Sequence, residues 1–281
     1  MKIFTSISEM QKQGLFLKAM REKTGFVPTM GFLHEGHLSL IKQAKKECSS
    51  VVVSIFVNPT QFSPDEDLES YPRNMQKDKK MLRYLDVDYL FLPSAEKIYK
   101  EPFLTSVSVT GITEVGEGVS RPTHFKGVTT VVTKLLNIIQ PNILYLGQKD
   151  IQQAVIIDKM TKDLNIPVKV EICDTLREKD GLAMSSRNVY LTEDQRKSAT
   201  ALIRALRKAE SLVNTGKKDT KIIEREMKKE LDKYPDIRPD YILFADKYAF
   251  QPVKKITNET VIAIAGFAGK VRLIDNIIVK P

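Results

Sequence analysis

The sequence predicts an α/β fold in which a doubly wound parallel sheet is followed by a smaller α+β domain. Residues 51–57 form an almost wholly apolar, β-branched run, which is typical of a parallel strand buried on both faces. Short apolar runs alternate with helical patterns through the first 178 residues, and this alternation favours right-handed crossovers between parallel strands. After residue 178 the pattern changes to amphipathic helices followed by three closely spaced strands.

The expected elements of the first domain can be placed in order along the chain. Strands are indicated by short apolar runs at residues 2–4, 25–27, 51–57, 88–93, 107–109, 142–146 and 168–172. Helices are indicated by apolar side chains at helical spacing from about Ser8, after His37, from Arg73 to Leu85, from Val128 to Ile139 and after Asp150. The glycine-rich residues 111–127 are expected to form a surface loop that could cover a site.

The second part of the chain has its own pattern. Thr192 and Gln195 form a capping-box signature ahead of the first helix, and a second amphipathic helix follows. Three strands with short connections, expected to pair as an antiparallel sheet, are indicated at residues 241–244, 261–265 and 271–274. A boundary near residue 178 therefore gives two domains, residues 1–178 and residues 179–281.

The bulk composition limits the class of protein. The 281 residues are 42% hydrophobic and 28% charged, as in a soluble globular protein with one large or two ordinary domains. No run approaches the ~18 apolar residues of a membrane span, and the N-terminus lacks a secretory hydrophobic region, so we expect a cytosolic protein. Cys48 and Cys173 suggest neither a disulfide framework nor a CxxC redox motif.

The formal charge of +9 raises the question of nucleic-acid binding. Between Arg196 and Arg238 there are 13 Lys or Arg and 7 Asp or Glu residues, but the two signs are interleaved, as on a solvated helix surface. No aromatic stacking motif accompanies them. An RNA-binding module is the alternative, and it predicts salt-sensitive binding of RNA by residues 196–238 alone.

The stretch from Pro28 to His37 joins a strand to a helix and contains two glycines and two histidines. A helix that opens after a glycine-bearing loop offers backbone N–H groups and the positive end of its dipole to an anion. Gly31 and Gly36 permit positive φ or a close ligand, and His34 and His37 share one helix face. The stretch indicates a phosphate-handling corner, with capping or packing as the alternative for each histidine. Zinc fits poorly because the spacing is i, i+3 and no clear third ligand is nearby.

Other polar groups also follow strands or precede helices. Lys149, in the strand-to-helix corner at residues 147–153, is a compact cation that suits a triphosphate oxygen. Asp150 there can cap the helix, contact a ligand, or do both. Gln61 follows the strand at residues 51–57, where open α/β sheets bind ligands, and is either a ligand contact or an exposed amide.

Two clusters of cations and hydroxyls are less specific. Arg121, His124 and Lys126 precede a helix and either face a phosphate or cap and solvate a loop, the second being slightly favoured. The residues after Met184 offer hydroxyl donors and a guanidinium fork, and they form either a phosphate clamp or an ordinary loop.

Taken together, these motifs resemble those of the pantothenate synthetase family along the whole chain. The resemblance rests on Pro28-Thr29-Met30-Gly31 through His34-Glu35-Gly36-His37, Val57-Asn58-Pro59-Thr60-Gln61-Phe62, Gly147-Gln148-Lys149-Asp150 with Gln153, and Met184-Ser185-Ser186-Arg187. The HxGH element alone would indicate only the wider class of Rossmann-like adenylate-forming and nucleotidyl-transferring enzymes. The resemblance implies a Rossmann-like, HxGH nucleotidyltransferase-like catalytic domain and a smaller domain that covers the active site.

The resemblance also implies an activity. Members of the family are AMP-forming ligases of pantothenate and coenzyme A biosynthesis, which condense (R)-pantoate with β-alanine using ATP and Mg²⁺. The pantoate carboxylate attacks the α-phosphorus to form pantoyl adenylate, and the β-alanine amine then displaces AMP. A cytoplasmic homodimer with small-molecule partners only, and neither nucleic acid nor membrane, is implied. A nucleotidylyltransferase that stops after AMP transfer is the alternative, but it would need more basic residues for a phosphate-bearing acceptor.

The resemblance assigns roles to individual residues. The implied catalytic residues are His34, His37 and Lys149, with His37 as the proton donor. The implied ATP-binding residues are Met30, Gly31, His34, Gly36, His37, Gly147, Gln148, Lys149, Asp150, Leu176, Met184, Ser185, Ser186 and Arg187. Met30, Gln61 and Gln153 would bind pantoate, and Gln61 would also contact β-alanine. The protein ligands of Mg²⁺ stay open, with Asp78 as a candidate. Leu176 stands where other members often carry valine.

Overall fold

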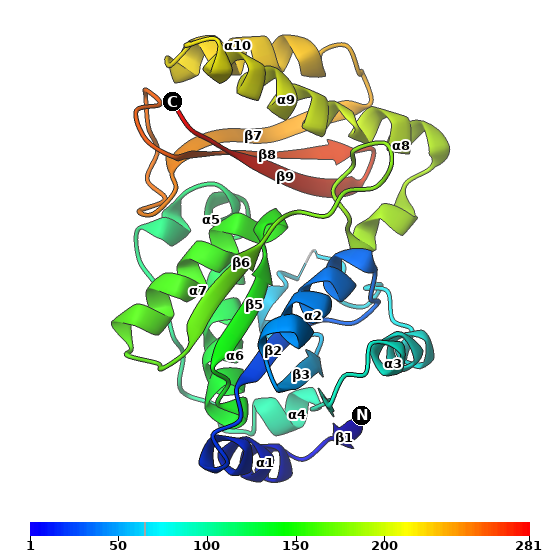
Figure 1. Cartoon of the computed structure of the whole chain (residues 1–281). Helices are drawn as coiled ribbons and strands as arrows, with labels where there is room; N and C mark the ends of the chain where they lie inside the picture. The colour runs from blue at the N-terminus through cyan, green and yellow to red at the C-terminus, as the bar shows by residue number, and fades with distance from the viewer. Residues whose placement is uncertain (65) are drawn as a thin grey trace. The chain divides into compact units, whose positions relative to one another are not determined.

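The computed structural model describes residues 1–64 and 66–281, which divide into two compact units (Figure 1). The first unit comprises residues 1–110, 121–147 and 156–174, and the second comprises residues 111–120, 148–155 and 175–281. The main division, after Asp174, lies close to the expected boundary near residue 178. Two earlier segments nevertheless belong to the second unit, so neither unit is one continuous stretch of chain.

The first unit is built on a six-stranded parallel sheet, which confirms the predicted fold class. Its strands are β1 (Lys2–Phe4), β2 (Thr24–Thr29), β3 (Ser50–Ile55), β4 (Tyr89–Phe91), β5 (Ile143–Gly147) and β6 (Lys169–Cys173). They lie in the order β1-β4-β3-β2-β5-β6, with all neighbouring pairs parallel. The chain runs outward from β2 through β3 to β4, then returns to β5 on the other side of β2. The carboxyl ends of β2 and β5 therefore flank the topological switch point, where such sheets bind ligands.

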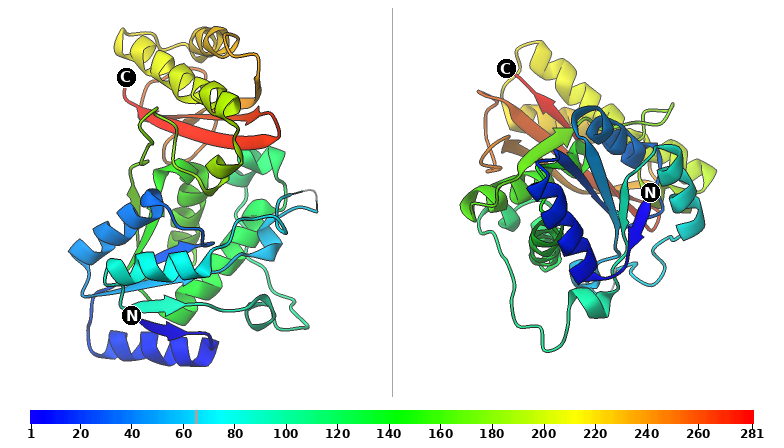
Figure 2. Two further views of the ribbon diagram at one scale, coloured as in Figure 1. Left: turned by 90° about the vertical axis from the view of Figure 1, so that its right-hand side faces the viewer. Right: turned by 60° about the horizontal axis from the view of Figure 1, so that its bottom comes forward.

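Helices bury the central strands β2, β3 and β5, as the apolar runs predict, whereas the edge strands β1 and β6 are largely exposed or half-buried. The helices with residues in this unit are α1 (Ile7–Ala19), α2 (Glu35–Glu47), α3 (Met75–Tyr84), α4 (Ala95–Ile98), α6 (His124–Ile139) and most of α7 (Ile151–Asp163). Every residue of β3 is buried, as expected for a central parallel strand. Helix α2 contacts β2, β3 and β5 through its apolar face, and α1 lies beside α6 (Figure 2). The sheet core thereby fixes where β2 ends and α2 begins.

The prediction of a strand at residues 107–109 is wrong. Threonine hydroxyls of α6 take the backbone groups of Val107 instead of a neighbouring strand. The Val107 amide donates to Thr130 Oγ1 at 3.0 Å, and the Val107 carbonyl accepts from Thr129 Oγ1 at 2.6 Å. Because side chains already satisfy this backbone, the segment needs no place in the sheet.

The prediction of a surface loop at residues 111–127 is also wrong for most of that stretch. It contains the 3₁₀ turn η2 (Ile112–Glu114), helix α5 (Glu117–Ser120) and the start of α6. Buried Gln152 donates to the carbonyls of Ile112 and Val115, both at 2.8 Å, and accepts from the Glu117 amide at 3.0 Å. The Glu117 carboxylate is held in turn by Arg272 at 2.7 Å. A side chain distant in sequence therefore orders a stretch that looks loop-like from its glycines.

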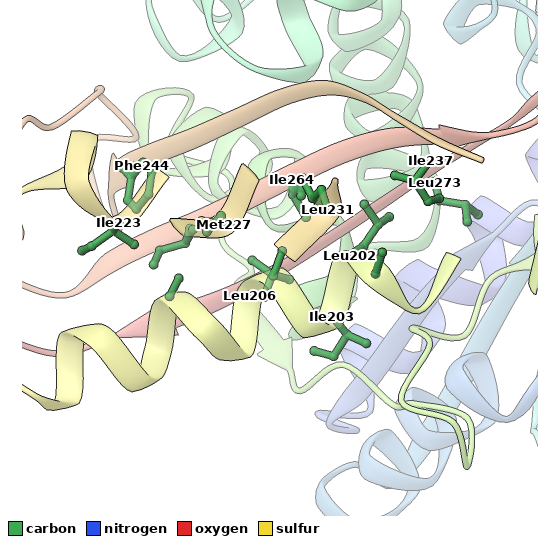
Figure 3. Close-up of a cluster of buried hydrophobic side chains, with 14 of the residues drawn as sticks. Leu202, Ile203, Leu206, Ile223, Met227, Leu231, Ile237, Phe244, Ile264 and Leu273 are labelled. Atoms are coloured by element: carbon green, nitrogen blue, oxygen red, sulfur yellow. The ribbon is translucent and has the colours of Figure 1, made fainter. Parts of the chain in front are cut away.

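The second unit contains the predicted antiparallel sheet. Its strands are β7 (Ile237–Asp246), β8 (Thr260–Ala268) and β9 (Val271–Val279), in the order β7-β8-β9. The helices that follow residue 192 are α8 (Glu193–Ala199), α9 (Ala201–Asn214) and α10 (Thr220–Leu231), and the capping box of Thr192 and Gln195 is confirmed. Apolar side chains of α9 and α10 pack with residues of the sheet, as Leu206, Met227 and Ile264 illustrate (Figure 3). Burial of each such side chain contributes about 1.5–3 kcal/mol.

The basic segment of this unit is a solvated helix surface. Lys228 lies 2.6 Å from Glu224, and Lys229 lies 2.8 Å from Glu226 within α10, all at helical spacing. Such exposed pairs contribute little to stability, but they show that neighbouring carboxylates neutralise part of the positive charge. No helix within residues 1–64 and 66–281 has the length and apolarity required to cross a membrane.

Candidate active site

The corner after β2 turns sharply at Gly31. Its φ is +86°, and an added Cβ would lie 2.9 Å from Ile55 Cγ2 and 3.1 Å from Asp78 Oδ2. Both the backbone conformation and the surroundings therefore require glycine, as predicted. Gly36 differs, because it lies within the first turn of α2 and is not among the glycines with positive φ.

Asp78 in α3 braces this corner. Its two carboxylate oxygens accept the backbone N–H groups of Phe32 and Leu33, both at 2.8 Å. The side chain is buried, and burial raises the pKa of Asp78 by more than these hydrogen bonds lower it. Because each oxygen already holds an amide, the geometry supports a structural brace better than the magnesium ligand considered from sequence.

We expect Asp78→Asn to lower the free energy of unfolding by about 1–3 kcal/mol, because an amide NH₂ would face a backbone N–H that now meets an oxygen. Urea denaturation measures this change. Asp163→Asn, which alters a half-exposed carboxylate paired with Lys159, is the matched control and should change stability by less than about 0.5 kcal/mol. If Asp78→Asn left the stability unaltered but raised the Mg²⁺ concentration required for half-maximal activity, the structural role of Asp78 would be contradicted.

The two histidines form a reciprocal cap at the start of α2. His34 Nδ1 accepts the Gly36 amide at 3.2 Å, and His37 Nδ1 accepts the His34 amide at 3.4 Å. Their ring centroids are 4.0 Å apart. Because each Nδ1 accepts a backbone N–H, a neutral ring in this arrangement carries its hydrogen on Nε2. Capping thus orients both Nε2–H groups as donors, whereas the Gly36 amide is occupied by the cap.

Gln61 and Met30, two of the predicted pantoate residues, lie together. Gln61 ends the 3₁₀ turn η1 (Pro59–Gln61) after β3, and its Nε2 lies 3.2 Å from Met30 Sδ. Its Oε1 accepts from Asn58 Nδ2 at 3.1 Å. Gln61 is buried, so the alternative of an exposed loop amide is excluded. The structure therefore places an oriented primary amide beside an apolar thioether.

Arg121 and His124 contact the main-chain carbonyl of Gln61. His124 Nδ1 lies 2.9 Å from the Gln61 carbonyl oxygen, and Arg121 pairs with Glu66 at 2.6 Å. Burial raises the pKa of Glu66, but the hydrogen bond and charge of Arg121 outweigh it, so that this pKa lies below its usual value. These contacts support the loop-structuring interpretation of this cluster over the phosphate-binding one.

In the second unit, the turn η3 (Gln148–Asp150) leads directly into α7. Lys149 Nζ lies 3.4 Å from Asp150 Oδ1, and its side chain is 21% exposed. Gln153 is half-buried, whereas the adjacent Gln152 is buried and fully used by the segment at residues 112–117. This turn therefore combines a partly accessible ammonium and amide with a firmly held backbone.

Leu176 and Met184, two of the predicted ATP-binding residues, belong to a small hairpin. The Met184 amide donates to the Leu176 carbonyl at 3.0 Å, and Gly181, with φ +92°, forms the turn between them. Ser185 then caps the 3₁₀ turn η4 (Ser186–Tyr190), its Oγ accepting the Arg187 amide at 3.3 Å. The hairpin thus leads directly into the turn that carries Ser185, Ser186 and Arg187.

The predicted residues divide between the two units. The first unit contains Met30, Gly31, His34, Gly36, His37, Gln61 and Gly147. The second unit contains Gln148, Lys149, Asp150, Gln153, Leu176, Met184, Ser185, Ser186 and Arg187. Among the described residues, no three or more His, Cys, Asp or Glu side chains are arranged to hold a metal ion.

Sequence reasoning missed the residues that position these groups. Three buried amides do this: Asn58 binds Gln61, Gln152 binds the segment at residues 112–117, and Asn276 binds Gln148 and Lys149. A buried polar side chain must find partners, but its burial is not visible in a local sequence pattern. Asn58 and Gln152 lie within predicted site segments but carried no predicted role, and Asn276 lies in none of those segments.

Comparisons with known proteins match this chain from end to end. The family model described as pantoate-beta-alanine ligase matches residues 2–278. The pantothenate synthetase of Thermosipho africanus is 50% identical over 279 residues, which cover 99% of this chain and 100% of that protein. The pantothenate synthetase of Caldicellulosiruptor bescii is 49% identical over 280 residues, covering 100% of this chain and 99% of that protein.

Solved structures give the same match. Pantothenate synthetase from Thermus thermophilus has a TM-score of 0.94 at 40% identity, with all of both chains covered. Pantoate-beta-alanine ligase from Francisella tularensis, solved in complex with beta-gamma ATP and beta-alanine, has a TM-score of 0.82 at 39% identity, covering 99% of this chain and 97% of that chain.

Proposed function

This chain belongs to the pantoate–β-alanine ligase family, and from that membership we propose how its own residues carry out the reaction. The reaction is the ATP-dependent ligation of pantoate and β-alanine to pantothenate. We propose that it proceeds through pantoyl adenylate, with both groups of site residues serving it. The observation that carries this proposal is the full-length family match, because it includes all the motifs that hold these residues.

The first step replaces one bond to the α-phosphorus of ATP by another. A pantoate carboxylate oxygen bonds to phosphorus, and the bond to the departing diphosphate breaks. Negative charge grows on the phosphoryl oxygens and on diphosphate, so prearranged donors and cations lower the barrier most. We assign this role to the Nε2–H groups of His34 and His37 and to the Lys149 ammonium. Ser185, Ser186 and Arg187 bind the remaining phosphate oxygens.

The second step forms the amide. The β-alanine nitrogen bonds to the acyl carbon, the bond from that carbon to the AMP oxygen breaks, and the nitrogen loses a proton. Exclusion of water preserves the adenylate until the amine arrives. Gln61, Met30 and Gln153 hold the pantoyl part, and the Gln61 amide also contacts β-alanine.

We expect Gln61→Ala to raise the KM for pantoate about five- to tenfold, because the loss of one directed hydrogen bond is worth about 1–1.5 kcal/mol. The KM for ATP should stay within about twofold, since Gln61 binds the acid and not the nucleotide. Initial-rate kinetics with each substrate varied in turn measures both constants. Gln11→Ala, on the exposed face of α1, is the control. A change confined to ATP would overturn the assignment of Gln61 to pantoate.

We propose that Mg²⁺ enters as its complex with ATP and is held mainly by phosphate oxygens. The carboxylate of Asp78 accepts two backbone amides, so we do not assign it to Mg²⁺. Asp150 is the acidic side chain among the assigned ATP-binding residues and would be the protein group nearest the ion. When bound, Mg²⁺ neutralises part of the triphosphate charge. Lys149, 3.4 Å from the Asp150 carboxylate, would orient that carboxylate in the same subsite.

We also propose that the enzyme is a homodimer and acts in the cytoplasm, as the family resemblance implies. Sedimentation equilibrium distinguishes a dimer from a 31.9 kDa monomer.

ATP–diphosphate exchange tests the proposed route. Purified protein, ATP, Mg²⁺ and labelled diphosphate are combined with pantoate, and β-alanine is left out. Pantoate-dependent exchange is expected, followed by pantothenate when β-alanine is added. Folded, ATP-binding protein that gives no exchange would contradict the adenylate route and favour a nucleotidylyltransferase acting on a phosphate-bearing acceptor.

A further inference from the structure

Strand β9 carries two adjacent buried polar residues, Asp275 and Asn276, in the second unit. Their exposed fractions are 4% and 2%. Successive side chains of a strand leave on opposite faces, so the two residues reach different segments of the chain. Strand β9 lies at the edge of its sheet and pairs with β8 along one side. Each residue holds one of two segments of this unit that we assign to ATP, residues 148–150 and the hairpin from Leu176 to Met184.

Asn276 binds the turn that carries Lys149. Its Nδ2 donates to the main-chain carbonyls of Gln148 at 2.8 Å and Lys149 at 2.9 Å. Its Oδ1 accepts from Gln148 Nε2 at 3.3 Å. One buried amide thus uses both of its donor hydrogens and its acceptor oxygen on two consecutive residues. Because the carbonyl of Lys149 is fixed, the direction in which its Cα–Cβ bond leaves the backbone is restricted.

Asp275 binds the hairpin that carries Leu176 and Met184. Its two oxygens accept from Arg177 Nη1 at 2.6 Å and Nη2 at 3.0 Å. The same guanidinium donates to the Gly181 carbonyl at 3.2 Å, in the turn of the hairpin. Arg177 Nη2 also reaches the Asn276 carbonyl at 3.4 Å. A bidentate pair of this kind fixes direction as well as distance.

We propose that Asp275 and Asn276 are positioning residues for ATP activation. Asn276 fixes the backbone of Lys149 and thereby restricts the position of its ammonium. Asp275, through Arg177, fixes the conformation of the hairpin from Leu176 to Met184. Neither side chain is assigned a contact with substrate. This inference rests on the proposed role of Lys149, and the two can fail separately. Strand β9 is then the common support for the two segments of this unit that we assign to ATP.

Asn276→Asp and Asn276→Ala test the first arm. The aspartate has the same shape but turns both carbonyl contacts from attractive to repulsive, and the alanine removes them. Each variant is expected to lower kcat for ATP–diphosphate exchange by about 10- to 100-fold, with the KM for ATP changed less than about threefold. In a Lys149→Ala background the same substitutions should cost less than about threefold, because a positioning residue has nothing left to position. Equal losses in both backgrounds would overturn the proposal.

Hydrogen exchange provides a readout independent of activity. Amides of residues 148–155 should exchange at least about tenfold faster in either Asn276 variant, while those of β8 keep their protection. Leu273→Ala removes a buried apolar side chain of the same strand and is the control for lost stability. Leu273→Ala should lower the melting temperature, while its kcat for ATP–diphosphate exchange at 25 °C stays within about twofold of wild type. Matching kcat losses in Leu273→Ala would assign the effect to stability and overturn the proposal.

Asp275→Asn tests the second arm and keeps the question answerable where an Asn276 variant does not fold. It weakens the Arg177 pair, and it should speed amide exchange in residues 176–184 and raise the KM for ATP about fivefold or more. Unchanged hydrogen exchange of these amides would overturn the positioning role of Asp275. Faster local hydrogen exchange with normal ATP–diphosphate exchange, in an Asp275 or an Asn276 variant, would instead show that β9 supports the segment but that the segment does not contribute to the reaction of ATP. That outcome counts against the proposed function.

Discussion

Replacing Lys149 with alanine is expected to slow pantoate-dependent ATP–diphosphate exchange by about 10²-fold or more. The ammonium is mostly shielded, with a side-chain exposure of 21%, and its backbone is held by Asn276. A fixed cation in a partly desolvated position stabilises the charge of the transition state more than a mobile one does. The loss should therefore appear mainly in kcat.

Lys162→Ala is the matched control for this prediction. Lys162 lies on the same helix, α7, its side chain is 70% exposed, and it pairs with Asp158 one turn away. Its removal should leave exchange within about twofold of wild type. Lys149→Arg keeps the charge but changes its shape, and it should recover only part of the rate. Wild-type exchange by Lys149→Ala would refute the role of this residue.

Replacing His37 is expected to have an effect of similar size, about 10²-fold or more on exchange. Two substitutions separate catalysis from capping. Asparagine can place its Oδ1 near the position of His37 Nδ1 and accept the His34 amide, but it offers nothing at the Nε2 position. Alanine removes both functions, and a lost cap costs about 0.5–2 kcal/mol.

We therefore expect His37→Ala to lose activity and stability together, and His37→Asn to lose activity while staying closer to the wild-type stability. Exchange kinetics and urea denaturation of the same samples measure the two effects. Near-normal exchange by His37→Asn would mean that the residue serves only to begin α2. Equal losses of stability in both variants would mean that asparagine does not replace the cap.

The parallel sheet was predictable because burial on both faces leaves a strong local pattern. Strand β3, with every residue buried, is an apolar run in the sequence as well. The failures share a different cause. The segment at residues 107–109 is held by threonines of α6, and residues 112–117 are held by Gln152. Partners so distant in sequence leave no periodicity in the segment they stabilise.

The candidate site divides in the same way. The predicted residues Met30, Gln61 and Lys149 follow the ends of β2, β3 and β5, and the cap by His34 and His37 fits the strand-to-helix corner. The motifs gave no indication that Asp78 would brace Phe32 and Leu33, which lie 46 and 45 residues away. A single aspartate on an amphipathic helix looks the same in sequence whether it faces water or a backbone amide.

The support of Lys149 by β9 has a consequence for the growing chain. Asn276 follows Gln148 by 128 residues and Lys149 by 127. At the usual pace of translation, about 5–20 residues per second, the turn waits on the order of 10 s for its partner. Water must solvate those carbonyls during the interval. A ribosome-bound chain can therefore complete the parallel sheet while its turn is still unsupported, and catalytic competence should appear after the β8–β9 hairpin closes.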